Sequence, residues 1–395
     1  MSERPYPRQF WLLCAGSFFF FGSFNMVVPE LPSIITRLGG AEYKGLIISL
    51  FTLTAMLSRP FSGRLADTVG RVPVMIFGSL VCIVCSFWYP FVATVNGFLL
   101  LRFFHGFSTG FSPTGFTAYV ADIVPAGRRG EAMGLLSTFG TLGMAGSPAL
   151  GGWLQAEWSL DVTFYASAVF AMVAVAIFLS VTETLHNRQR FRASHLAVTW
   201  SDLYEPRVLV PCVIMVMTSF SFGTMLTVVP DLSDSLGLAN RGMVFMVFTL
   251  SSVAIRIIAG QLSDRFGRPA ILKFSTVLIA VSMAVTGFAD QPYMLYLGGI
   301  LYGVANGINS PTLFAWATDL GDEQAKGRAF AFLYISLEFG IGAGALASGW
   351  FLNGPAPNFP AAFSSGCILG LLALIYLLLK TKGRNLRNST PVVVN

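Results

Sequence analysis

The sequence predicts an all-α integral membrane protein in which one six-helix bundle occurs twice, giving twelve transmembrane helices. Hydrophobic residues make up 54% of the 395 positions and charged residues 11%, whereas about a quarter of the residues in a soluble domain are charged. The other two observations are an internal repeat and a series of apolar stretches long enough to span a bilayer. A water-soluble fold could not bury this much apolar surface, so we expect lipid to cover part of it.

The internal repeat covers nearly the whole chain. PheGly and ValValProGlu in residues 21–30 return as PheGly and ValValProAsp in residues 222–231. Residues 59–71 and 256–268 share an initial Arg, the pattern Gly-x-Leu-x-Asp and a final GlyArg, and they lie 197 positions apart (264 − 67 = 197). The same spacing joins Gly106 to Gly303, Asp122 to Asp319 and Trp153 to Trp350. Duplication of one helical bundle accounts for this register.

Each expected helix corresponds to about 20 apolar residues, enough to cross roughly 30 Å of hydrocarbon. In the first repeat these stretches are 10–29, 44–63, 72–93, 97–121, 130–154 and 162–181. In the second they are 207–229, 241–260, 270–289, 293–318, 327–352 and 360–379. We therefore expect an N-terminal bundle at 1–182, a cytoplasmic linker at 183–206 that rests on anionic lipid headgroups, and a C-terminal bundle at 207–395 that includes a short cytoplasmic tail.

Basic residues predict the orientation, because Lys and Arg are retained on the cytoplasmic side of short loops. With the N-terminus inside, the basic residues outside are only Arg37, Lys44 and Arg241, and those within spans are Arg59, Arg102 and Arg256. Both termini then face the cytoplasm. The net charge of +6 thus reflects orientation in the cytoplasmic (inner) membrane rather than nucleic-acid binding. The first span is too long for a signal peptide, so we expect it to be retained.

Motifs for enzymatic chemistry are absent from the sequence, which contains no nucleotide-binding P-loop, zincin motif or nucleophile elbow. Cys82 and Cys85 form a CxxC pair in an apolar span without a second pair, so we expect two buried side chains rather than metal ligands. We predict a chain that is not an enzyme, that needs no cofactor or metal, and that works as a monomer.

The loop between the second and third spans of each repeat carries a glycine, an aspartate and a closing GlyArg. A short loop needs glycines for its turns, a carboxylate to meet a helix N-terminus and arginines to bind acidic groups. On this loop and its repeat the chain resembles the major facilitator superfamily. In that family the loop latches the cytoplasmic gate, which assigns the role here to Gly63, Asp67, Gly70, Arg71, Gly260, Asp264, Gly267 and Arg268.

A second resemblance lies in the fifth span, where small residues follow the family's antiporter motif. The matching residues are Gly134, Gly143, Ser147, Pro148, Gly151 and Gly152. On these residues the chain resembles the drug/metabolite:proton antiporter branch of the superfamily. Small residues let helices approach closely, and Pro148 removes one backbone hydrogen bond and permits a bend. Position 345, the counterpart of Pro148, is alanine, so we expect a hinge in the N-terminal bundle alone.

Ionisable residues within the spans are candidates for proton coupling. Glu338 would lie about 16 Å into the eleventh helix, where an ionised carboxylate costs several kcal/mol unless it is paired or protonated, and its counterpart is Thr141. Arg102 and His105 match a family pattern linked to proton coupling, although Arg102 could instead reach the outer headgroups. Glu30 and Asp231, matched carboxylates at outer helix ends, complete the set.

In this family helices 1, 4, 7 and 10 line the central cavity. The matching candidates are Phe21, Phe24, Asn25, Ser108, Ser112, Phe222, Met225, Tyr302, Asn306 and Asn309. An aromatic wall with few amides and hydroxyls suits an amphipathic substrate, and the absence of a mid-depth cluster of Lys and Arg argues against polyanions.

The resemblance implies a secondary active transporter that works by alternating access. The motif in the fifth span favours proton-coupled efflux of a small amphipathic drug-like molecule or metabolite, so the expected partners are that molecule, protons and the lipid bilayer. Two alternatives stay open. One is a proton symporter that imports a small nutrient, and the other is a non-transporting membrane receptor, which would predict a large soluble appendage or a degraded gate loop.

Overall fold

The computed structural model describes residues 6–125, 128–192, 204–320, 326–353 and 357–381, and its regular elements there are helices. The first repeat contains α1 (Arg8–Val27), α2 (Leu31–Arg37), α3 (Lys44–Thr68), α4 (Arg71–Trp88), α5 (Val95–His105), α6 (Phe107–Ile123), α7 (Arg129–Glu157) and α8 (Leu160–Leu179). The second contains α9 (Leu209–Ser235), α10 (Gly242–Phe266), α11 (Arg268–Gly287), α12 (Pro292–Leu320), α13 (Lys326–Trp350) and α14 (Phe359–Thr381).

Helices stand at all twelve places where the sequence predicts a span. Within the described residues, eight helical stretches are long and apolar enough to cross a membrane, and α10, which is bent by 52°, makes a ninth if its two parts form one span. The others are less apolar or divided: α5 and α6 are separated at Gly106, while α7 and α12 are rich in glycine and polar residues. All twelve are consistent with an all-α membrane fold.

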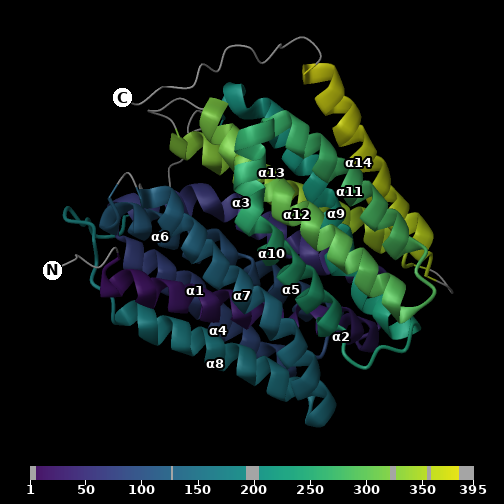
Figure 1. Cartoon of the computed structure of the whole chain (residues 1–395). Helices are drawn as coiled ribbons and strands as arrows, with labels where there is room; N and C mark the ends of the chain where they lie inside the picture. The colour runs from purple at the N-terminus through teal and green to yellow at the C-terminus, as the bar shows by residue number, and fades with distance from the viewer. Residues whose placement is uncertain (1–5, 126–127, 193–203, 321–325, 354–356, 382–395) are drawn as a thin grey trace.

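The two repeats pack in the same way. In the first, α1 packs on α7 and α8, and α4 on α6 and α8; in the second, α9 packs on α13 and α14, and α11 on α12 and α14. Figure 1 shows the first group of helices on one side of the molecule and the second group on the other. The bundles meet mainly where α3 packs on α13 and where α7 packs on α10. We call the end of this interface that lies near α2 the α2 end, and the opposite end the linker end.

Candidate functional site at the bundle interface

Two ion pairs join the bundles at the α2 end. Lys44 Nζ lies 2.6 Å from Asp231 Oδ2, and Arg241 Nη1 lies 2.8 Å from Glu30 Oε2. Lys44 and Arg241 are 197 positions apart, and Glu30 and Asp231 end the matching ValValPro segments, so the pairs are two copies of one contact. The candidates Glu30 and Asp231 therefore hold the bundles together at this end. Arg241 also binds Asp234, with Nη2 2.7 Å from Oδ2.

Glycines bring the interface helices into close contact beside these ion pairs. A Cβ at Gly45 of α3 would lie 2.7 Å from the Ala345 carbonyl oxygen of α13, and a Cβ at Gly242 of α10 would lie 1.9 Å from that of Pro148 of α7. These two contacts are again repeats of each other. The amide of Asn240 adds a hydrogen bond from Nδ2 to the Ala149 carbonyl oxygen at 3.0 Å. The interface is therefore closed at the α2 end.

The motif in α7 contributes to that closure and to packing within the first bundle. A Cβ at Gly143 would lie 2.2 Å from the Phe18 carbonyl oxygen, and one at Gly151 would lie 2.3 Å from that of Met26, so both glycines let α7 pack on α1. Gly152 faces Asn240 across the interface, whereas a Cβ at Gly134 would meet no described neighbour within 4 Å. The Ser147 hydroxyl is buried and has no hydrogen-bond partner among the described residues. Pro148 sits inside an unbroken helix.

Halfway along the interface, Arg59 of α3 pairs with Glu338 of α13. Arg59 Nη2 lies 2.8 Å from Glu338 Oε1, and both side chains are about nine-tenths buried. The guanidinium also lies over the Tyr334 ring, 4.3 Å from its centroid. Glu338 therefore forms a buried ion pair across the bundle interface. Sequence analysis placed Arg59 in a span without assigning it a role.

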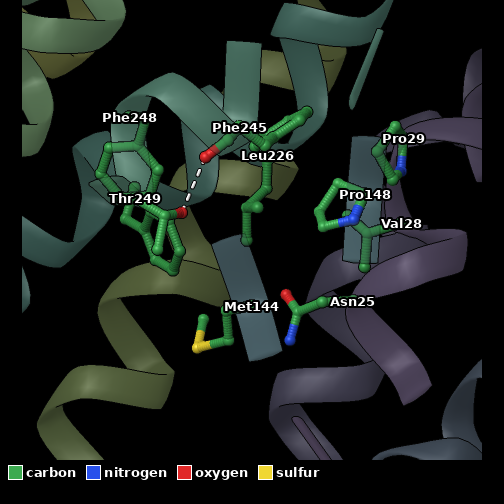
Figure 2. Close-up of a pocket in the computed structure, with 10 residues that line it drawn as sticks. Asn25, Val28, Pro29, Met144, Pro148, Leu226, Phe245, Phe248 and Thr249 are labelled. Carbon is green, nitrogen blue, oxygen red and sulfur yellow. Dashed lines mark hydrogen bonds between the residues drawn. The ribbon is translucent and has the colours of Figure 1, made fainter. Parts of the chain in front are cut away.

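A small cavity lies between the bundles near the α2 end, with a volume of about 10 Å³, which is room for roughly one water molecule. It is lined by Asn25, Val28, Pro29, Met144, Pro148, Phe222, Leu226, Phe245, Phe248 and Thr249. Figure 2 shows Asn25, Val28, Pro29 and Pro148 on one side, with Phe245, Phe248 and Thr249 on the other. The lining is aromatic and aliphatic with two uncharged polar side chains.

Two of the cavity candidates from the sequence, Asn25 and Phe222, line this space. In the second bundle Phe222 stacks with Tyr302, and Tyr302 is buried in the same apolar cluster as Met225. In the first bundle Phe21 and Phe24 pack on each other. Asn306 is partly buried. As substrate contacts these seven residues stay predictions.

Ser108, Ser112 and Asn309 face the interior of their own bundles. Ser112 Oγ donates to the Met75 carbonyl oxygen of α4 at 2.8 Å, and Ser108 Oγ donates to the His105 carbonyl oxygen. Asn309 joins Ser275 of α11 to Thr218 of α9. These three side chains face inward because buried hydroxyl and amide groups need hydrogen-bond partners. They find those partners on neighbouring helices or on the backbone of their own helix.

Arg102 lies inside the first bundle and does not reach the outer headgroups, because its side chain is 1% exposed. Its Nε donates to the Ile47 carbonyl oxygen at 3.0 Å, and its guanidinium lies over the Phe51 ring. His105 is fully buried, with Nδ1 3.3 Å from the Tyr89 hydroxyl oxygen and no partner for Nε2 among the described residues. The two residues therefore form a polar cluster that ties α5 to α3.

The signature loops at the linker end are held by arginines of their own bundles. Arg71 pairs with Asp67 at 2.8 Å and with Asp122 at 3.1 Å. Arg268 repeats this with Asp264 and, at 3.0 Å, with Asp319. Gly70 and Gly267 have φ of 142° and 86°, backbone that favours glycine. A Cβ at Gly63 or Gly260 would meet no described neighbour within 4 Å. In each of these ion pairs the aspartate and its arginine belong to the same bundle.

The start of the linker covers the first signature loop. Glu183 accepts hydrogen bonds from the backbone N–H groups of Arg71 and Val72, each at 3.0 Å, so it, and not Asp67, meets the N-terminus of α4. The backbone N–H of Gln189 donates to the Thr68 carbonyl oxygen at 2.8 Å. This part of the linker therefore contacts the first bundle, while contact of its exposed residues with lipid headgroups stays a prediction. Residues 193–203 lie outside the described part of the chain.

The described residues contain no group of three or more His, Cys, Asp or Glu side chains placed to hold a metal ion. The repeated contacts of the described interface are ion pairs and close helix contacts, and the pairing of Glu338, whose repeat counterpart is Thr141, departs from this repeat.

Comparison with known proteins gives consistent matches. The Major Facilitator Superfamily model matches residues 13–240 and 212–393. The multi-drug resistance efflux pump PmrA of Streptococcus pneumoniae serotype 4 is 29% identical over 370 residues, which cover 89% of this chain and 92% of PmrA. The multidrug resistance protein MdtG of Serratia proteamaculans is 27% identical over 341 residues, which cover 83% of each chain. The crystal structure of the nucleoside transporter NupG superposes with a TM-score of 0.75 at 14% identity, covering 96% of this chain and 100% of NupG, and supports the fold alone.

Proposed function

The chain belongs to the Major Facilitator Superfamily and is a multi-pass membrane transporter, not an enzyme; from this premise we propose that it exports small amphipathic molecules in exchange for protons by alternating access. The relatives that are named multidrug efflux proteins support export of drug-like molecules. We further propose that the α2 end faces outward, as the basic-residue pattern predicts. On that orientation, the structure is closed toward the outside.

The observation that carries the proposal is the ion pair between Arg59 and Glu338. It joins the bundles on the same α3–α13 interface that is closed at Gly45. Opening the outer side separates α3 from α13, so the pair has to break. Leaving one member of a buried pair without its partner costs about 3–5 kcal/mol, and this opposes the transition when neither substrate nor proton is bound.

A proton on Glu338 removes its negative charge and so lowers the cost of separating it from Arg59. A bound substrate that contacts either side chain has the same effect, because it replaces the lost partner. The empty, ion-paired protein therefore stays closed to the outside, and each transition requires a proton or a substrate. Because a proton and the substrate compete for the pair formed by Arg59 and Glu338, their fluxes are coupled.

The experiment that tests this function uses purified protein in liposomes with a pH-sensitive dye inside and a fluorescent amphipathic dye as substrate. A proton gradient is imposed in either direction, and protein orientation is determined by protease accessibility of the linker arginines. We expect substrate to move in the direction opposite to the downhill flow of protons. Added substrate should increase that proton flux. Movement of substrate and protons in the same direction would support the symporter alternative. A proton flux that is the same with and without substrate, together with no movement of the substrate dye, would contradict transport.

A further inference from the structure

The bundle interface contains a second arginine that the repeat relates to Arg59. Arg256 of α10 lies 197 positions after Arg59, and its Nη1 contacts Ser137 Oγ of α7 at 3.3 Å. Ser137 is the repeat counterpart of Tyr334, over which Arg59 lies. The two arginines therefore occupy equivalent places on the two faces of the interface.

The two arginines differ in their counter-charges. Glu338 pairs with Arg59, but the equivalent residue facing Arg256 is Thr141, which donates its hydroxyl proton to the Ser137 carbonyl oxygen. Among the described residues no carboxylate lies within ion-pair distance of Arg256, and its Nε is buried without a hydrogen-bond partner. A charged side chain at mid-depth in a membrane protein normally pairs with another group, and this guanidinium contacts one hydroxyl.

The surroundings of Arg256 leave room for a ligand and offer it an apolar surface. Ser137 is exposed although it faces the opposite bundle, so open space adjoins the guanidinium. Thr249 of the small cavity precedes Arg256 by seven residues, so the aromatic lining begins about 10 Å farther along the same helix face. Met144, seven residues after Ser137 and so two turns farther along the same face of α7, also lines that cavity (Figure 2).

We propose that Arg256 binds the anionic group of an amphipathic organic anion whose apolar body lies toward Met144, Phe245 and Phe248. A guanidinium binds a carboxylate or similar group through two parallel hydrogen bonds, and Nε with one terminal nitrogen forms such a fork. One arginine balances one negative charge, so the ligand is a monoanion or a zwitterion. This inference names the substrate class of the exporter proposed above and rests on that function.

The test measures binding of three probes of one shape to the purified, full-length protein in detergent, without any proton gradient. The probes are 1-naphthoate, 1-naphthamide and 1-naphthylmethylammonium, titrated calorimetrically at pH 7.5. We expect 1-naphthoate to bind at least about tenfold more tightly than 1-naphthamide, since hydrogen bonds to a charged group are the stronger ones, and the ammonium probe to bind most weakly. Equal affinities of naphthoate and naphthamide would overturn the proposal.

Variants identify the residue responsible. Arg256→Gln should abolish the preference for naphthoate, and Arg256→Lys should retain part of it. Thr141→Glu keeps Arg256 but supplies the carboxylate that the first repeat lacks, so it should weaken naphthoate binding about tenfold or more, while the uncharged control Thr141→Gln should not. Unchanged naphthoate affinity in Thr141→Glu contradicts the proposal even if Arg256→Gln fails to fold.

These measurements separate this inference from the proposed function, because binding requires no gradient. Naphthoate binding that depends on Arg256, together with absence of proton-driven movement in liposomes, would contradict the exporter and leave the anion site in place. Proton-driven export of a cationic dye with no preference for naphthoate would contradict the anion site alone.

Discussion

The ion pairs at the α2 end predict that one substitution, Glu30→Gln, shifts the protein toward a state that is open at that end. Glutamine keeps the size of the side chain and removes its charge, so Arg241 loses one partner across the interface. Arg241 retains Asp234, which belongs to its own bundle and does not hold the interface closed. The repeat-related pair of Lys44 and Asp231 remains intact and limits the effect.

The magnitude follows from the geometry of the pair. Two unit charges 2.8 Å apart attract by about 6 kcal/mol at an effective dielectric constant near 20, but desolvation offsets much of this. Exposed pairs contribute about 0–1 kcal/mol, and loss of one member of a buried pair costs about 3–5 kcal/mol. The Glu30 side chain is 3% exposed and that of Arg241 is 17% exposed. Because Arg241 keeps Asp234, we expect Glu30→Gln to destabilise the state that is closed at the α2 end by about 2 kcal/mol. This shifts the equilibrium between the closed and the open state about 30-fold.

The assay is the distance between spin labels at Ala41→Cys and Ala239→Cys, two exposed positions on opposite bundles at the α2 end. Cys367, the free cysteine that is not fully buried, is replaced by serine. We expect one short distance in the parent and an added longer distance in Glu30→Gln. The control is Glu157→Gln, a loss of an exposed carboxylate at the end of α7, which should leave the parental distribution. An unchanged distribution in Glu30→Gln would refute the argument.

Three further predictions concern the helix contacts and the loops. Gly143→Ala places a Cβ about 2.2 Å from a carbonyl oxygen of α1, so we expect the free energy of unfolding to fall by about 1–3 kcal/mol and the Tm in detergent to be lower. The control is Gly146→Ala, whose Cβ would meet no described neighbour within 4 Å. Equal Tm values for the two variants would contradict the close contact. Glu183→Gln removes a negative charge at the N-terminus of α4 that stabilises this contact by about 0.3–1 kcal/mol. We expect trypsin to cleave the linker after residue 183 faster. An unchanged cleavage rate would contradict a role of Glu183 in holding the linker on the first bundle. Asp67→Asn should slow transport in liposomes with folding retained, and a parental rate would exclude a role of Asp67 in the gate.

The fold could be predicted in detail because each span must satisfy its own backbone hydrogen bonds and bury an apolar length set by the bilayer. The repeat even fixes which helices form equivalent contacts. Helix ends were less predictable: α1 continues through a short 3-10 turn into α2, which ends at Arg37. That extension depends on packing across the bundles, which composition does not reveal.

The candidate site was predicted only in part. Glu338 stood out because a carboxylate in a span is rare, but its partner Arg59 lies 279 positions earlier, and nothing in the sequence links the two. Lys44 and Arg241 were interpreted as topological charges, although their common spacing of 197 positions was a usable signal of a paired role. Helix number alone predicts Ser112 as a cavity residue and does not reveal which face of the helix it occupies. Its hydroxyl donates to the Met75 carbonyl oxygen of α4, and its contact with substrate stays a prediction.

The central claim, that Glu338 couples substrate movement to protons, is tested most directly by measuring two kinds of transport in the same liposomes. One is exchange of labelled for unlabelled substrate without a gradient, and the other is accumulation driven by a proton gradient. We predict that Glu338→Gln retains exchange and loses accumulation, whereas the control Glu42→Gln, at an exposed glutamate, retains both. Full proton-driven accumulation by Glu338→Gln at a matched protein level would contradict the account.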